Sequence, residues 1–295
     1  MFRERPRWQT KVIRPVVRRF PADWSQERRH QWEVIARRLL GQPLSAHSWH
    51  RMTFNDKVLY RGLCDRDERF AIFCDKLRMR HYVTGLLGSE VVPRLLRVGE
   101  QASEFKDLDG PFVLKANHGS NWVTVVGPGA SLSEHQLEEA QRWVETDYWS
   151  TAANGCSEWG YRDARRLLLA EELLPGPPDD CKLLVFGGHT AVVQVDTGRF
   201  GERRRALMSP DWSRIVGRLR FPLPDGAVPK PPNLDTMIEW ASVLGGDLDF
   251  LRVDCYDLGD RVLVGELTPY PGGGIAPFRP KELDRELGAL WRLKR

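Results

Sequence analysis

The sequence predicts an α+β fold in which helices are layered against mostly antiparallel sheets. Two hairpin patterns support this class: residues 182–187 and 190–196 flank a Gly-Gly turn, and residues 250–256 and 262–267 form a second pair of strands. Helical segments are interspersed with these hairpins, and that mixture is typical of α+β proteins. With 295 residues, 41% of them hydrophobic and 28% charged, the chain fits one large globular domain or two modest ones. A disordered chain and a disulfide-rich miniprotein are excluded.

The N-terminal region carries the basic charge of the chain. Residues 1–40 contain 11 Lys or Arg against 4 Asp or Glu, whereas the other 255 residues contain 33 against 36. We expect residues 1–24 to form an irregular arm and residues 25–40 to form a helix that ends at Gly41. The arm has no nucleic-acid-binding motif, so we expect no nucleic-acid partner. Docking to an anionic membrane surface or to a protein partner is the alternative use of such an arm.

The rest of the chain predicts alternating helices and strands. In the first half, we expect a helix over 75–87, strands over 112–115 and 122–126 with a turn-rich loop at 118–121 between them, and a helix that reaches about Tyr148. A strand over 167–170 and a Pro/Gly linker at 175–178 come next, followed by the first hairpin and a basic loop over 199–205. The last part contains a Pro-rich stretch over 222–232, a helix that stops at 245–246, the second hairpin, and a C-terminal helix after residues 269–274. Ser131 and Glu134 are expected to form a capping box for the helix that reaches Tyr148. Asn233 is expected to cap the helix that stops at 245–246.

Two acidic residues of the second hairpin form a candidate metal site. Asp254 alternates with apolar residues, and Glu266 stands among apolar neighbours on the returning strand. If the two residues pair directly, paired numbers sum to 520, which a three-residue loop at 259–261 satisfies. Their Cβ atoms would then lie about 5 Å apart on one face. Like charges so close favour a cation between them, and oxygen ligands suit Mg²⁺. An ordinary solvent-facing strand is the alternative interpretation.

Lysine is scarce, with nine of the 44 basic residues, so each internal Lys is of interest. Lys115 ends a strand directly before His118, Gly119 and Ser120, where backbone N–H groups can hold a phosphate. This signal is weak alone, because a Lys at the end of a strand is common.

The sequence gives little support for disulfide bonds, a zinc site or the common catalytic motifs. The five cysteines, an odd number without a C-x-x-C pair, are expected to be buried thiols rather than disulfides or zinc ligands: Cys64, Cys74, Cys156, Cys181 and Cys255. The sequence contains no P-loop, no G-x-G-x-x-G opening a helix, no H-E-x-x-H and no G-x-S-x-G motif. It contains no apolar run of about 18 residues and no signal-peptide pattern, so we expect a cytoplasmic location.

A set of short segments matches a known family in order and spacing. They are residues 54–57 (Phe-Asn-Asp-Lys), 75–78 (Asp-Lys-Leu-Arg) with Tyr82 and Val83, 112–120 (Phe-Val-Leu-Lys-Ala-Asn-His-Gly-Ser), 170–174 (Ala-Glu-Glu-Leu-Leu), Asp196 with Arg199 and Phe200, 252–254 (Arg-Val-Asp) and 265–268 (Gly-Glu-Leu-Thr). From about residue 35 onward, the chain thereby resembles the ATP-grasp superfamily, and specifically its TupA-like branch of teichuronopeptide biosynthesis. No single motif is decisive; the specificity lies in the set.

The resemblance implies an ATP-grasp fold, in which two α+β subdomains grip ATP between antiparallel sheets. The charge distribution gives a basic N-terminal arm, and with the helical extension that follows it this region covers residues 1–60. An ATP-grasp domain would cover residues 61–295, with a hinge near residues 171–178. The region before Lys76 is too short for a complete, separate domain preceding the ATP-binding part.

The resemblance also implies which residues bind ATP. Lys76 and Lys115 would contact the phosphates, loop 118–121 would form a flap over them, and backbone groups of the hinge would bind adenine. The implied ATP-binding residues are Lys76, Lys115, His118, Gly119, Ser120, Glu171, Glu172, Leu173, Leu174 and Lys182.

The remaining implied roles concern the metal, the catalytic step and the acceptor. Mg²⁺ would be held by Asp254 and Glu266, and Thr268 stands where many ATP-grasp ligases have Asn, so its hydroxyl is a weaker ligand or none. Arg252 and Lys115 are the implied catalytic residues. The acceptor substrate would contact Asp196, Arg199, Arg204 and Arg205, although a solvated basic loop is the alternative there.

The expected activity is that of an ATP-dependent carboxylate–amine ligase that forms ADP through an acyl phosphate. The resemblance implies that it joins an amino acid to a cell-envelope polysaccharide or peptide precursor, with ATP and Mg²⁺. One alternative keeps the nucleotide site but makes the protein a kinase of a sugar or lipid-linked glycan intermediate. A second alternative is a scaffold that binds a membrane or partner through the basic arm, which would place the protein at the membrane periphery.

Overall fold

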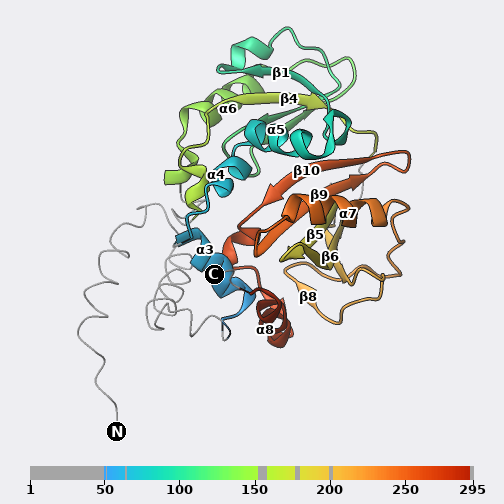
Figure 1. Cartoon of the computed structure of the whole chain (residues 1–295). Coiled ribbons are helices and arrows are strands. Elements are labelled where there is room, and N and C mark those ends of the chain that lie inside the picture. Colours follow the sequence, from blue (N-terminus) through green and yellow to red (C-terminus); the bar gives the residue numbers. More distant parts are fainter. Residues whose placement is uncertain are drawn as a thin grey trace, which may run out of the picture.

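Two antiparallel sheets stacked one above the other form the body of the protein (Figure 1). In this computed structural model, the structure describes residue 50 and residues 52–63, 65–151, 158–176, 180–198 and 202–292. The basic arm and the helix expected over residues 25–40 lie outside the described residues. Among the helices of the described ranges, none combines the length and the apolar character that crossing a membrane requires.

The first subdomain contains a four-stranded sheet. Its strands, in spatial order, are β1 (Leu95–Gly99), β4 (Leu168–Glu172), β2 (Phe112–Ala116) and β3 (Val123–Val126). Along β2, the side chains of Phe112, Leu114 and Ala116 alternate inward and pack with Ala140 and Trp143 of α6 (Glu134–Glu145).

Helix α6 is capped two residues later than expected. Ser133, rather than Ser131, accepts a hydrogen bond from the backbone N–H of Gln136, and the Gln136 side chain accepts one from the backbone of Ser133. Ser131 instead donates to Asp109. The α-helix also ends at Glu145, before Tyr148, which begins a separate 3₁₀ turn, η4 (Tyr148–Ser150).

The second subdomain contains a five-stranded antiparallel sheet. Its strands, in spatial order, are β10 (Val262–Thr268), β9 (Phe250–Asp257), β5 (Asp180–Phe186), β6 (His189–Thr197) and β7 (Arg204–Met208). Helix α7 (Leu234–Gly245) packs on one face of this sheet. Asn233 occupies its N-cap position, but the Asn233 side chain donates to Asp257 instead of capping the helix. The expected basic loop over 199–205 is wrong at its end, because Arg204 and Arg205 already belong to β7.

Further helices, turns and a short ribbon complete the two subdomains. They are α3 (Phe54–Leu63), α4 (Arg69–Cys74), α5 (Lys76–Leu87), α8 (Lys281–Leu290), the 3₁₀ turns η2 (Ser89–Val91), η3 (Ala102–Phe105), η5 (Trp159–Tyr161) and η6 (Pro271–Gly274), and a two-stranded ribbon of β8 (Arg218–Leu219) and β11 (Phe278–Arg279). Helix α3 is hydrogen-bonded to the end of α8. The buried side chain of Lys57 on α3 donates to the carbonyls of Gly288 at 2.6 Å and Trp291 at 2.7 Å.

The cysteines of the described part behave as expected. Cys74, Cys181 and Cys255 are free and buried. Cys64 and Cys156 lie outside the described residues.

The second hairpin has the expected pairing but a different turn. Asp254 lies opposite Glu266, as predicted, whereas the connection is a four-residue loop at 258–261, not three residues at 259–261. A bulge at Gly265 shifts the register by one residue and so restores the Asp254–Glu266 pair. A Cβ at position 265 would lie 2.5 Å from the ring of Tyr256, so this close approach requires glycine.

Candidate active site

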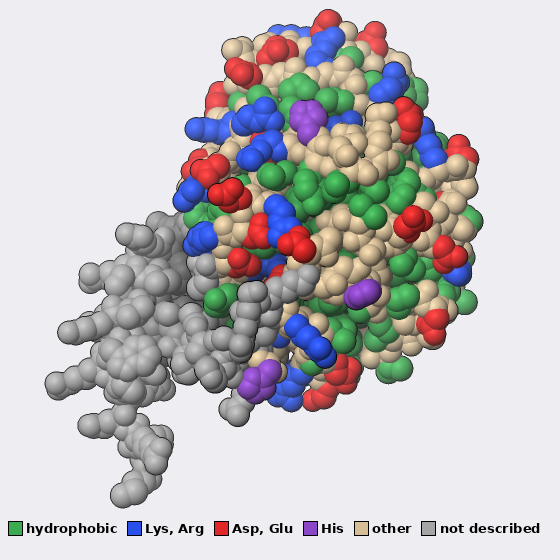
Figure 2. All heavy atoms as spheres, viewed as in Figure 1, with side chains coloured by type: hydrophobic (Ala, Val, Ile, Leu, Met, Phe, Trp, Pro, Cys, Tyr) green, Lys and Arg blue, Asp and Glu red, His purple; other side chains and the backbone are tan. Residues whose placement is uncertain are grey.

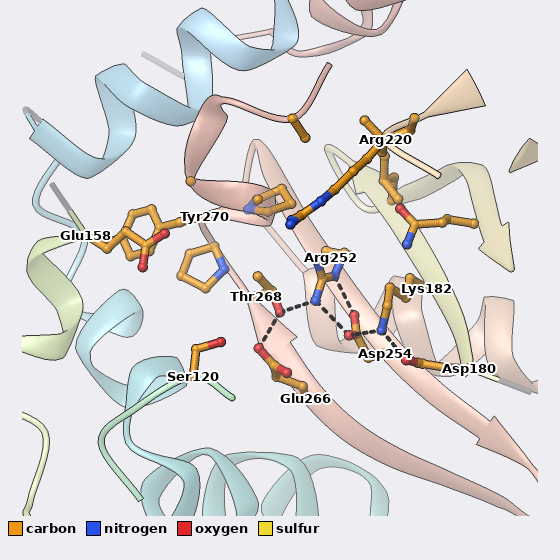
Figure 3. A pocket seen from close by; sticks show the side chains of 18 of the residues that line it. Ser120, Glu158, Asp180, Lys182, Arg220, Arg252, Asp254, Glu266, Thr268 and Tyr270 are labelled. Atoms are coloured by element: carbon orange, nitrogen blue, oxygen red, sulfur yellow. Dashed lines mark hydrogen bonds and ion pairs between the residues drawn. The ribbon is translucent and has the colours of Figure 1, made fainter. Parts of the chain in front are cut away.

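A cavity of about 660 Å³ opens between the two subdomains, a volume typical of small-molecule sites. The first subdomain contributes Ser120, Tyr148 and Glu158 to its lining, and the second contributes one face of the five-stranded sheet and turn η6 (Figure 3). On the outer face shown in Figure 2, Lys and Arg side chains are interspersed with Asp and Glu side chains.

The register of the five-stranded sheet aligns polar side chains in one row. Glu266 lies opposite Asp254, and Asp254 lies opposite Lys182. Lys182 in turn lies opposite Gln194, so the row crosses four strands. Alternate residues such as Cys181 are fully buried on the other face, where α7 packs. The strand period thus separates a polar, cavity-facing side from an apolar core.

The centre of this row is a dense network of ion pairs. Lys182 Nζ lies 2.5 Å from Asp180 Oδ2 and 2.7 Å from Asp254 Oδ2. Arg252 donates through Nε and Nη2 to the two oxygens of Asp254, at 2.6 and 2.7 Å. Burial alone would raise the pKa of Asp254, but Arg252 and Lys182 outweigh it and hold the pKa below its usual range. Asp254 therefore stays ionised.

Glu266 and Thr268 lie beside this network and complete an oxygen-rich site. The Thr268 hydroxyl donates to Glu266 Oε1 at 2.9 Å and accepts from Arg252 Nη2 at 3.0 Å. The described residues contain no group of three or more His, Cys, Asp or Glu arranged to hold a metal. Carboxylate and hydroxyl oxygens are the donor types that Mg²⁺ takes, usually one or two carboxylates together with substrate phosphates. Both oxygens of Asp254 are already engaged by Arg252 and Lys182, so a metal bound here would displace part of this network.

Glu158 is a member of the cavity that sequence reasoning missed. It precedes η5 on the first subdomain and lines the same cavity as Glu266. Burial, together with the negative charge of Glu266, raises the pKa of Glu158 to about 8. No motif marks this residue in the sequence, because it lies in a segment without a regular period.

The two expected phosphate lysines lie on the first-subdomain side and do not line the cavity. Lys76, at the start of α5, donates to the carbonyls of Ala116 at 2.7 Å and Gly119 at 2.5 Å. Burial lowers the pKa of Lys76 to about 8. Lys115 Nζ lies 2.5 Å from Glu171 Oε2, and Arg80 pairs with the other oxygen of Glu171 at 3.0 Å.

Loop 118–121 connects β2 with β3 next to these lysines. The His118 side chain is buried, with Nε2 at 3.0 Å from the Trp143 carbonyl and 3.1 Å from that of Thr146, so it anchors the loop rather than reaching a ligand. Gly119 packs against the ring of Trp122, and its carbonyl holds Lys76. Of this loop, Ser120 and Asn121 line the cavity.

The expected hinge follows the last strand of the first sheet. Glu171 and Glu172 end β4, where the Glu172 N–H donates to the Arg94 carbonyl and its side chain accepts from the Arg94 N–H. Leu173 and Leu174 are half-buried and lead toward β5 of the other sheet. The Glu171 side chain is occupied by its two ion pairs, so only backbone groups of this segment are candidates for binding a base.

The expected acceptor residues divide into three groups. Asp196 is buried and accepts from Arg205 and from Arg203, a residue not anticipated from the sequence, at distances of 2.5 to 2.7 Å. Arg203 and Arg205 line the cavity, whereas Arg204 is directed elsewhere and pairs with Asp225 at 2.8 Å. Arg199 lies outside the described residues.

Comparison with family models gives a match to the TupA-like ATP-grasp family over residues 56–292. A search of curated proteins gives no significant match. Similar solved structures include an ATP-grasp ligase, PsnB, in complex with a precursor variant, Mg and ADP (17% identity, 75% of this chain and 59% of that chain, TM-score 0.39).

Two further similar structures complete this comparison. They are a D-alanine–D-alanine ligase from Bacillus anthracis (18% identity, 74% and 65%, TM-score 0.41) and an ADP complex of N5-carboxyaminoimidazole ribonucleotide synthetase (14% identity, 67% and 45%, TM-score 0.37). The chain thus spans between 45% and 65% of the length of these three proteins.

Proposed function

Because the chain belongs to the TupA-like ATP-grasp family, we propose that it is an ATP-dependent carboxylate–amine ligase that forms ADP. The observation that carries the proposal is the row of Glu266, Asp254 and Lys182 beside Arg252 in a cavity between two subdomains. Transfer of a phosphoryl group between anions requires such a concentration of cations and metal-binding carboxylates.

The proposal assigns the two sides of the cavity to different parts of the reactants. Asp254 and Glu266, with the Thr268 hydroxyl, would hold Mg²⁺, which supplies positive charge to the ATP phosphates. Lys76, Lys115 and loop 118–121 would contact those phosphates, and backbone groups of residues 171–174 would contact adenine. Lys76 already interacts electrostatically with Glu266, whereas Lys115 is paired with Glu171, so a phosphate contact by Lys115 requires that ion pair to open.

The proposed reaction has two steps. The acceptor carboxylate attacks the γ-phosphorus of ATP, so a C–O–P linkage forms as ADP leaves. The amine then attacks the carbonyl carbon, phosphate leaves with its electron pair, and the amine loses a proton to give an amide. Arg252 keeps its charge, because Asp254 and Glu266 raise its pKa against the effect of burial, and it would stabilise the transferred phosphoryl group. A closed cavity would keep water from the acyl phosphate.

We further propose that the amine is an amino acid and that the acceptor is a cell-envelope polysaccharide or peptide precursor. Family membership supports this substrate class. The basic arm would dock the protein to a membrane or to a biosynthetic partner. The division into an extension over residues 1–60 and an ATP-grasp domain over residues 61–295 stays a prediction.

The test is ADP release from ATP and Mg²⁺ with a panel of amino acids and uronate-containing acceptors. We expect ADP release that needs both substrates, and its loss in Glu266→Gln with an unchanged melting temperature. Glu282→Gln, an exposed change on α8, is the matched control. Near-normal turnover of Glu266→Gln would contradict the assignment of this carboxylate.

Isotope labelling of the acceptor separates a ligase from a kinase. With ¹⁸O in the acceptor carboxylate, one labelled oxygen must appear in the released phosphate if an acyl phosphate forms and is cleaved at its carbonyl carbon. A stable phosphorylated product without amine-dependent phosphate release would instead identify a kinase.

A further inference from the structure

Three guanidinium groups surround one aromatic ring at one end of the cavity. Arg203, Arg205 and Arg220 lie over the ring of Phe221, with distances of 4.7, 4.8 and 5.3 Å from the guanidinium carbon to the ring centroid. All four residues line the cavity. They come from two places, because Arg203 and Arg205 flank the start of β7 while Arg220 and Phe221 follow β8.

The charges at this end are not balanced. Asp196 accepts from both Arg203 and Arg205, and also from Gln194 at 3.2 Å, so its carboxylate is fully used. Within the described ranges, Arg220 forms no ion pair. The neighbouring network of Asp180, Lys182, Arg252 and Asp254 contains two cations and two anions, and Glu266 beside it adds one negative charge. Arg203, Arg205, Arg220 and Asp196 together carry a net charge of +2, which this single charge does not balance. The Phe221 end therefore has an excess of positive charge that a bound anion would offset.

The backbone at Arg220 is held in an unfavourable conformation. Its φ is 62°, in the left-handed region that β-carbon-bearing residues rarely adopt. Hydrogen bonds on both sides keep it there: the Arg220 N–H donates to the Pro277 carbonyl at 3.0 Å, and the Arg205 N–H donates to the Pro222 carbonyl at 2.8 Å. Such strain concentrates at sites that position a ligand-binding group.

The consequence of this conformation is visible in the cavity. Figure 3 shows the Arg220 side chain extended into it rather than outward. Arg218, two residues earlier on the same ribbon, lies opposite Arg279; both Arg218 and Arg220 are exposed, but only Arg220 lines the cavity. Glycine would be the unstrained choice at position 220, so the presence of Arg indicates that the side chain is used.

We propose that Arg220 binds an oxyanion of the acceptor substrate, a carboxylate or phosphate other than the carboxylate that reacts. The acceptor would then carry at least two anionic groups, and Arg220 would select for the second one. The proposal rests on the proposed function for the identity of an acceptor. It assigns the anion to the acceptor rather than to ATP, because the residues proposed for adenine and the phosphate lysines do not line the Phe221 end.

The test compares two probes that differ only in the second anion. Glycerate and 3-phosphoglycerate are titrated by calorimetry into the full chain saturated with Mg²⁺ and the ATP analogue AMPPNP. We expect 3-phosphoglycerate to bind at least about tenfold more tightly, the effect of one charge-assisted hydrogen bond. Arg220→Gly and Arg220→Ala should abolish this difference, whereas Arg220→Lys should keep part of it. Arg218→Ala is the matched control and should keep all of it.

A second readout separates ligand binding from a structural role. Because Arg220→Gly relieves the strained φ, we expect a melting temperature that does not fall, although the second anion is no longer recognised. A lower melting temperature in Arg220→Gly would show that the guanidinium serves the fold, and would overturn the proposal.

Three binding results would also overturn it. They are equal affinity of the wild type for both probes, unchanged discrimination in Arg220→Ala, and loss of AMPPNP affinity without loss of discrimination, which would assign Arg220 to the nucleotide. A ligase assay that fails with every amine while this discrimination persists would count against the proposed function only.

Discussion

Lys76 and Lys182 are two lysines on opposite sides of one cleft, and their environments shift their pKa values in opposite directions. Lys182 Nζ lies between the carboxylates of Asp180 and Asp254, which outweigh its burial and raise its pKa. Lys76 Nζ donates to two neutral carbonyls, those of Ala116 and Gly119, and its burial lowers its pKa to about 8. The kind of partner, rather than the depth of burial, decides the direction.

The opposite pKa shifts indicate different roles for the two lysines. The charge of Lys182 is already neutralised within the five-stranded sheet, so this lysine holds the carboxylate row in place. The charge of Lys76 is carried without an ion pair in the described part of the chain. An incoming phosphate would stabilise that charge, which makes Lys76 the stronger candidate for a direct nucleotide contact.

The largest expected effect is on stability. Lys182→Met leaves Asp180 and Asp254 with one compensating cation fewer in a buried network, so we expect a loss of about 3 kcal/mol in the free energy of unfolding. Lys76→Met removes hydrogen bonds to neutral carbonyls and a longer-range attraction to Glu266 and Glu171 that does not offset the burial of Lys76, and should change it by about 1 kcal/mol or less. Urea denaturation of the two variants measures both values. Equal losses would contradict the distinction between the two lysines.

A smaller effect is expected on the pH dependence of nucleotide binding. Lys76 is protonated below its pKa of about 8 and loses its charge as the pH rises through that value, so AMPPNP affinity should fall severalfold above it. Lys76→Arg remains charged throughout and should flatten this decrease. Affinity measured by calorimetry between pH 7 and pH 10 gives both profiles. The same alkaline decrease in Lys76→Arg would assign the titration to another group, such as Glu158.

Sequence reasoning predicted the Asp254–Glu266 pair correctly but assumed the wrong turn between the two strands. The alternation along residues 250–256 predicted which side chains share a face, and Asp254 does lie opposite Glu266. The loop length was wrong because a four-residue loop and a one-residue bulge at Gly265 produce the same pairing as a three-residue loop. Counting residues cannot distinguish a longer loop combined with a bulge from a shorter loop without one. A glycine inside an apolar strand is nevertheless a known sign of a bulge.

The residues that sequence reasoning missed come from irregular segments. Glu158, Arg203 and Arg220 reach the cavity through a 3₁₀ turn, a strand end and a left-handed residue. Neither a helical nor a strand period predicts the direction of such side chains. Most of the longer helices and strands were predictable from periodicity, but α3, α4, β1 and β7 were not predicted. The far end of the cavity depends on tertiary contacts between loops.

The central claim is that Glu266 and Asp254 form the metal-dependent nucleotide site, and Mn²⁺ binding in the presence of AMPPNP tests it most directly. Electron paramagnetic resonance counts free Mn²⁺ during titration of the wild type, Glu266→Gln and the Glu282→Gln control. The account predicts nucleotide-dependent Mn²⁺ binding by the wild type and the control, and an affinity at least about tenfold weaker in Glu266→Gln. Equal Mn²⁺ affinity in all three proteins would contradict it.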